Sequence, residues 1–135
     1  MTENTGPVFT RTVTQERIAA YAEASGDHNP VHLDADFAAT TRFGGTIAHG
    51  MILFGYMSEA LSQVYGAAWA GTGRMRARFR APARPGDVVE VSAEERSRQP
   101  RDDGTIDVHC IVECWKAEPR ERLATGDATL TVKEQ

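Results

Sequence analysis

The feature that most constrains the fold is one apolar segment near the middle of the chain. Residues 51–57 read MILFGYM and carry no charge, so a helix built from them is apolar on every side and is predicted to be buried all round. Polar side chains appear only from Ser58 onward, and Gly66 is a natural helix end. We therefore predict a helix from Gly50 to about residue 65, about 24 Å long, that other elements must cover.

The second half of the chain has a different period. Beyond residue 71, apolar and polar side chains alternate, which is typical of half-buried strands. The predicted strands are residues 74–80, 88–95, 106–114 and 123–132, joined by turns at 83–87 and 116–121 and by a polar loop at 97–104. Before the apolar helix we predict a strand at 8–13 and helices at 15–24 and 35–42. A curved antiparallel sheet wrapped around one helix, an α+β fold, satisfies this pattern.

Composition narrows the class of protein. A length of 135 residues suits one domain over 1–135, since a domain has roughly 100–200 residues. The net charge of −4 argues against nucleic acid or an anionic membrane as the main partner. The first residues show no basic and apolar leader, and no apolar run approaches the ~20 residues that span a bilayer. We expect a cytoplasmic protein, in which Cys110 and Cys114 are buried free thiols.

The candidate chemistry lies in residues 21–34, which read YAEASGDHNPVHLD. Pro30 prevents a continuous helix across this stretch, so Asp27 and His32 are predicted to stand on a tight loop. From the residues alone, Asp27 could equally be a turn residue and His32 a buried hydrogen-bonding histidine. A metal site is a further alternative, although its ligands would have no recognised spacing; they would be Asp27, His28, His32 and Asp34.

Together with residues 37–51, which read FAATTRFGGTIAHGM, this stretch closely resembles the MaoC-like, R-specific enoyl-CoA hydratases. The resemblance is tight over the first half of the chain, and the strand-rich second half agrees only in length and pattern. It implies a hotdog fold, in which a long central helix is wrapped by a curved antiparallel sheet. The chain departs from the family at Ala35, where relatives often have proline, and only local stiffness should change.

The resemblance also implies roles for five residues. Asp27 and His32 would be the catalytic pair, and the backbone N–H of Gly50 would form the oxyanion hole. Asn29 would orient the pair, and Ser58 would supply a supporting hydroxyl to the substrate. No metal and no cofactor is expected, and a homodimer with sheets continuing across the interface is the expected assembly.

The implied reaction is the reversible R-specific hydration of trans-2-enoyl-CoA to (R)-3-hydroxyacyl-CoA, in fatty-acid or polyhydroxyalkanoate metabolism. A carboxylate and an imidazole on one loop can act as base and acid, and a free N–H at the start of a helix can stabilise the thioester oxyanion. The alternatives are a 3-hydroxyacyl-[acyl-carrier-protein] dehydratase, a hotdog acyl-CoA thioesterase and an acyl-CoA binding module without turnover.

Two further features are expected to have no catalytic role. His49 is expected to be structural, stabilising the turn before the apolar helix. The alternating arginines at 74–80 are expected to be the solvated face of an outer strand, with a grip on the phosphates of coenzyme A as the alternative.

Overall fold

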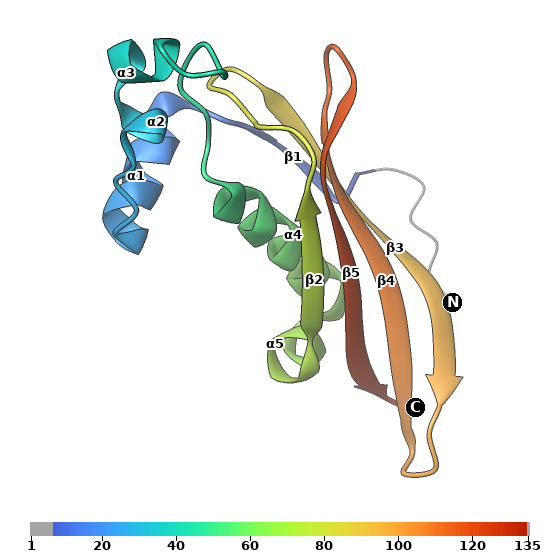
Figure 1. The fold of residues 1–135 in the computed structure, drawn as a ribbon. Helices are drawn as coiled ribbons and strands as arrows, with labels where there is room; N and C mark the ends of the chain where they lie inside the picture. Colours follow the sequence, from blue (N-terminus) through green and yellow to red (C-terminus); the bar gives the residue numbers. More distant parts are fainter. Residues whose placement is uncertain (1–6, 135) are drawn as a thin grey trace.

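The computed structural model describes residues 7–134 and contains one five-stranded antiparallel sheet with a long helix along one of its faces (Figure 1). The strands lie in the order β1-β3-β4-β5-β2. They are β1 (Phe9–Thr12), β2 (Arg74–Phe79), β3 (Val88–Pro100), β4 (Thr105–Lys116) and β5 (Glu121–Lys133). The helices are α1 (Gln15–Ser25), α2 (Pro30–Leu33), α3 (Ala35–Ala39), α4 (Gly50–Tyr65) and α5 (Ala67–Thr72). This is the architecture that the hotdog resemblance implies.

The core lies between α4 and the inner face of the sheet. Met57 and Leu61 of α4 are fully buried, as are the inward-pointing residues of the central strands. Burying each such side chain contributes about 1.5–3 kcal/mol to folding. Cys110 and Cys114 point into the same core and are free thiols, which confirms their prediction. No helix within residues 7–134 is long and apolar enough to cross a membrane.

The prediction that α4 is buried all round is wrong for its first turns. Met51 is 52% exposed, and Gly55, one turn later on the same side, is exposed too. The reason is that the sheet stays open and contacts α4 on one side, while α1 to α3 stand beyond its N-terminal end (Figure 1). The chain therefore presents part of an apolar helix at its surface.

The other end of α4 is tied to the sheet through a buried carboxylate. The side chain of Glu95 in β3 is 3% exposed. It accepts a hydrogen bond of 2.7 Å from the hydroxyl of Tyr65, the last residue of α4, and one of 2.6 Å from Arg98. Burial raises the pKa of Glu95, but these two bonds outweigh it, so its pKa lies below the usual value. The hydrogen bond from Tyr65 joins the last turn of α4 to strand β3.

The largest differences from the predicted boundaries are in the β3–β4 hairpin and at the end of α3. Strand β3 continues to Pro100, and strand β4 begins at Thr105. The expected loop at 97–104 is therefore mostly a β-hairpin, and only residues 101–104 form its tip. Both faces of this extension are polar, and hence no alternation marks it as a strand. Helix α3 ends at Ala39 rather than at residue 42, where threonine hydroxyls bond to carbonyls of the last turn and compete with the helix.

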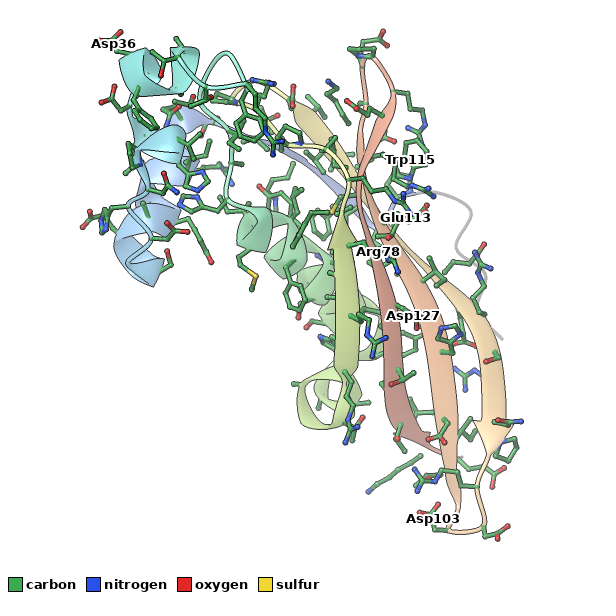
Figure 2. All side chains as sticks on the ribbon, viewed as in Figure 1. Asp36, Arg78, Asp103, Glu113, Trp115 and Asp127 are labelled. Atoms are coloured by element: carbon green, nitrogen blue, oxygen red, sulfur yellow. The ribbon has the colours of Figure 1, made fainter. Side chains whose placement is uncertain are left out.

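The outer face of the sheet is charged. Met75 and Ala77 of β2 pack against the core, so the arginines that alternate with them point outward, as the solvated-face interpretation predicted. Arg78 of β2, Glu113 of β4 and Asp127 of β5 all lie on this face (Figure 2).

Candidate active site

The Asp27 loop follows directly from the end of α1. Thr14 caps the start of α1 by accepting from the N–H of Arg17, and Gly26 ends the helix in the left-handed region with φ 81°. A glycine adopts this conformation without a steric penalty. The chain then turns, and the N–H of Asp27 donates to the Ser25 hydroxyl at 3.2 Å. Asp27 is exposed and is the first residue beyond the cap.

The other half of the predicted loop is a short helix. Asn29 is the N-cap of α2, accepting from the N–H of Val31 at 3.1 Å, and Pro30 occupies its first position, where proline is favoured. His32 therefore stands on a helical turn rather than on the predicted loop. With only four residues, α2 is too short to show a helical period in the sequence. The carbonyl of His32 accepts from Gln15 of α1 at 2.7 Å, which joins the two helices.

The orientation of the His32 ring is fixed by a backbone contact. Nδ1 of His32 lies 2.9 Å from the carbonyl oxygen of Ile47. A carbonyl can only accept a hydrogen bond, so Nδ1 carries the proton and Nε2 is left free to exchange one. The residue is 9% exposed, which keeps this nitrogen close to the surface of the site.

The structure brings Asp27 and His32 together and adds a third side chain. One ligand-type atom from each of Asp27, His32 and His49 lies within 4.8 Å of the other two. Because a hydrogen bond joins heavy atoms about 2.8 Å apart, one water can bridge a carboxylate oxygen and an imidazole nitrogen at this separation. His49 is 2% exposed, and its position was not predicted to be part of the site.

Gly50 offers the donor that the resemblance implies. It is the first residue of α4, and within residues 7–134 its N–H has no hydrogen-bond partner. The N-cap residue His49 makes no side-chain bond to the helix start. The unpaired N–H groups and the positive end of the helix dipole therefore favour negative charge at this place.

Two apolar clefts lie on either side of the start of α4. One, of about 320 Å³, lies between α1 and α4. It is lined by Val13, Arg17, Ile18, Ala20, Tyr21, Met51, Ile52, Gly55 and Tyr56. The other, of about 280 Å³, includes Gly50 itself and the segment after β2. It is lined by Arg42, Phe43, Ile47, Ala48, Gly50, Leu53, Phe79, Arg80, Ala81, Pro82 and Ala83.

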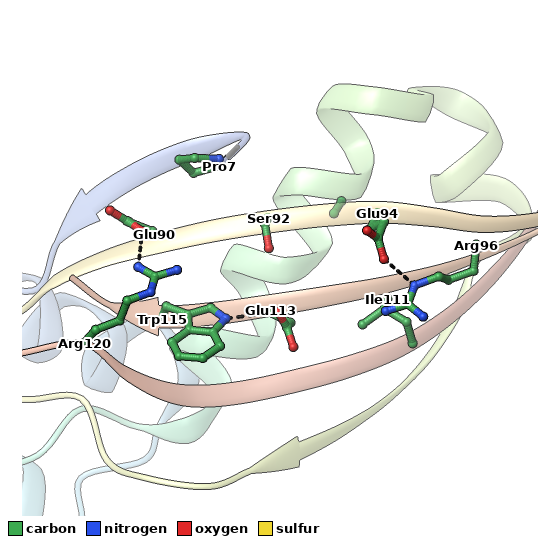
Figure 3. Close-up of a pocket in the computed structure, with 10 residues that line it drawn as sticks. Pro7, Glu90, Ser92, Glu94, Arg96, Ile111, Glu113, Trp115 and Arg120 are labelled. Atoms are coloured by element: carbon green, nitrogen blue, oxygen red, sulfur yellow. Dashed lines mark hydrogen bonds and ion pairs between the residues drawn. The ribbon is translucent and has the colours of Figure 1, made fainter. Parts of the chain in front are cut away.

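A third hollow, of about 370 Å³, lies on the outer face of the sheet and has a different character (Figure 3). Its charged side chains are paired with one another: Arg120 bonds to Glu90 at 2.8 Å, and Arg96 pairs with Glu94. The indole N–H of Trp115 donates to a carboxylate at 3.0 Å. A hollow whose charges are already matched has little to offer an ionic ligand, so we place the candidate site at α4.

Other residues singled out from the sequence have structural partners. Ser58 accepts a 2.9 Å hydrogen bond from the indole N–H of Trp69 in α5, and it stands about 12 Å along the helix from Gly50. A substrate contact at Ser58 stays a prediction, as does the orienting role of Asn29, whose N–H donates to Asp27 at 3.3 Å.

The alternative metal site does not assemble as predicted. Asp34 caps α3 through the N–H of Phe37. His28 pairs with Glu23 at 2.9 Å, and this hydrogen bond raises the pKa of His28. Both side chains are thus engaged away from Asp27 and His32.

The sequence is similar to a family model and to known proteins. The family model described as "MaoC like domain" matches residues 2–114. A 3-hydroxybutyryl-CoA dehydratase of Methylorubrum extorquens is 32% identical over 134 residues, covering 87% of this chain and 83% of that protein. An (R)-specific enoyl-CoA hydratase of Aeromonas caviae is 40% identical over 92 residues, covering 66% of this chain and 65% of that protein.

The fold is shared with solved structures. The (R)-hydratase from A. caviae involved in PHA biosynthesis superposes with a TM-score of 0.73 at 27% identity, covering 94% of this chain and 92% of that one. The match therefore extends through the strand-rich half, beyond the two sequence motifs. By the family model and by the shared hotdog fold, this chain belongs to the MaoC-like domain family.

Proposed function

We propose that the protein catalyses the reversible R-specific hydration of trans-2-enoyl-CoA to (R)-3-hydroxyacyl-CoA. The observation that carries this proposal is the proximity of the Asp27 carboxylate to the His32 ring, beside the start of α4 with its unpaired N–H. The chain is an enzyme of the hydro-lyase class, in keeping with relatives named as hydratases and dehydratases. A role in fatty-acid or polyhydroxyalkanoate metabolism follows from the same reaction.

In the proposed mechanism, one water is held between the two side chains. Asp27 removes a proton from it as its oxygen bonds to C3 of the substrate. The electron pair of the C2–C3 double bond moves onto the thioester, and Gly50 N–H stabilises the negative oxygen. His32, which begins the cycle protonated on both ring nitrogens, then delivers its Nε2 proton to C2 while its Nδ1–H stays on the carbonyl of Ile47. A proton passing from Asp27 to His32 resets the pair, so the water supplies both the hydroxyl and the new hydrogen.

The test of this function is incubation with crotonyl-CoA, following enoyl absorbance, thiol release and product chirality. We expect absorbance to fall, no thiol to appear, and the alcohol to be the R enantiomer. Thiol release would instead indicate a thioesterase, and an S product would contradict the proposed R specificity. Binding without turnover would leave only a binding module, and turnover of the acyl-carrier-protein thioester alone would indicate the corresponding dehydratase.

Two arginines support a substrate that carries phosphates. Arg42 and Arg80 line the cleft that contains Gly50, and neither takes part in an ion pair within residues 7–134. Guanidinium groups bind phosphate strongly, often through two hydrogen bonds. A coenzyme A thioester with its carbonyl at Gly50 would bring its phosphates toward these residues. This narrows the phosphate alternative for residues 74–80 to Arg80, the one that lines this cleft.

We predict that Arg42→Ala and Arg80→Ala each raise KM for crotonyl-CoA about 10- to 100-fold, since a hydrogen bond to a charged group contributes about 1.5–3 kcal/mol. The turnover number should change little. With crotonyl-pantetheine, which has no phosphate, both variants should match the unmodified protein. Arg76→Ala, on the outer face of β2, is the matched control. Equal KM increases for the two substrates would show that the arginines do not bind phosphate.

We also propose a homodimer. The sheet has two edges, β1 and β2, and an open edge pairs readily with another strand. The exposed side of α4, with Met51 at 52% exposure, adds apolar surface that a second copy could cover. Sedimentation equilibrium would report the mass of the assembly.

A further inference from the structure

His49 contacts more of the candidate site than any role in the turn before α4 requires. Nε2 of His49 lies 2.9 Å from the backbone carbonyl oxygen of Asp27. Its ring is stacked on that of His32, with centroids 3.8 Å apart and 25° between the planes. The ring of Tyr21 also contacts the His49 ring in an edge arrangement, with centroids 4.8 Å apart and 63° between the planes. The residue after His49 is Gly50, so this one side chain touches both members of the proposed pair and adjoins the proposed oxyanion donor.

The hydrogen bond to Asp27 fixes the state of the His49 ring. A carbonyl accepts and cannot donate, so the proton is on Nε2. The other nitrogen, Nδ1, is then an acceptor, and it is buried without a partner within residues 7–134. Leaving a buried polar group unpaired costs about 1–3 kcal/mol. A phenyl ring would make the same stack without this cost, so the useful part of His49 is its Nε2–H.

That N–H acts on a segment whose other hydrogen bonds, in the described part of the chain, are all local and lie within residues 22–32. Asp27 is exposed, and its loop connects two helices with only residues 26–29 between them. Within residues 7–134 the carbonyl of Asp27 accepts from His49 alone. Holding this carbonyl restricts ψ of Asp27, the rotation about Cα–C that sets the direction of the Cα–Cβ bond relative to the planar peptide.

We infer that His49 is a positioning residue that holds Asp27 at the correct place relative to His32 and Gly50 through its Nε2–H. The inference rests on the proposed hydratase function for its kinetic readout. A displacement of about 1 Å in a reacting group can lower the rate about 10²-fold. Loss of this contact should therefore lower kcat while leaving KM nearly unchanged, because His49 is buried and acts through Asp27.

Three substitutions of His49 distinguish its hydrogen bond to Asp27 from its stacking on His32. His49→Gln places an amide N–H near the position of Nε2, and His49→Asn places its amide near Nδ1, too short to reach Asp27. His49→Phe keeps the stack on His32 and removes the donor. We expect Gln to retain kcat within about 5-fold, and Asn and Phe to lose about 10²-fold. KM should stay within about 3-fold in all three.

A second readout does not depend on activity. Hydrogen exchange of residues 26–31, measured by mass spectrometry well below each Tm, should be faster in the Asn and Phe variants than in the Gln variant and the unmodified protein. The inference would be overturned if His49→Asn had the kcat and the hydrogen-exchange rate of the unmodified protein. It would also be overturned if His49→Gln and His49→Asn changed both quantities equally. If the unmodified protein does not hydrate crotonyl-CoA, the proposed function fails, and the exchange result still decides whether His49 fixes the loop.

Discussion

Asp27→Asn is expected to lower kcat for crotonyl-CoA hydration by about 10³-fold, within the range of ~10²–10⁴ that general acid–base catalysis contributes. The amide has the shape of the carboxylate but cannot accept the proton of the attacking water. The fold should be kept, because Asp27 is exposed and an amide oxygen can still accept from the N–H of Asn29. The loss of enoyl absorbance under saturating substrate measures the effect.

Asp34→Asn is the matched control for this change. Asp34 lies seven residues further along and caps α3 through the N–H of Phe37 at 3.1 Å. Asparagine caps a helix as well as aspartate does, so both activity and stability should be unaffected. Full activity in Asp27→Asn would remove Asp27 from the mechanism, whatever its distance from His32.

Gly50→Pro is expected to lower kcat about 10²–10³-fold, because it deletes the one N–H assigned to the oxyanion, worth about 2.7–4 kcal/mol. Few positions allow such a deletion without damage to a helix. Gly50 is the first residue of α4, where proline is favoured. The preceding residue His49 has φ −61° and ψ 138°, a conformation compatible with a following proline.

Gly50→Ala separates the lost N–H from the added carbon atoms. A Cβ at this position would lie 3.4 Å from the ring of Phe79, so both variants introduce the same Cβ contact, and proline alone adds Cγ and Cδ. Alanine keeps the N–H and should retain most of the activity. Helix content from circular dichroism should be equal in the two variants. If Gly50→Ala is as slow as Gly50→Pro, the contact with Phe79 is responsible and the oxyanion assignment is wrong.

The sequence could predict those parts of the site that local chemistry determines. Gly26 and Pro30 constrain the backbone within a few residues of Asp27, and the change of hydrophobic period after residue 71 separates helix from sheet. The start of α4 at Gly50 also follows from its apolar run. Each of these features depends on neighbours along the chain, which a sequence displays.

Contacts between distant residues could not be predicted in this way. The hydroxyl of Ser58 accepts from Trp69 across two helices, and nothing in the spacing distinguishes this partner from a substrate. The contacts of His49 with Asp27 and His32 depend on how residues 33–48 run in space. The hydrophobic period of the sequence does not predict that course. The exposure of Met51 likewise depends on how far the sheet curves.

The tip of the β3–β4 hairpin is a suitable site for inserting a peptide tag. This tip, residues 101–104, is exposed, and Asp103 lies at the opposite end of the molecule from Asp36 in α3 (Figure 2). Loop tips of this kind tolerate inserted peptides well. A biotin acceptor or affinity tag placed between Asp102 and Asp103 would tether the protein to a surface with the α1–α4 end facing the solution.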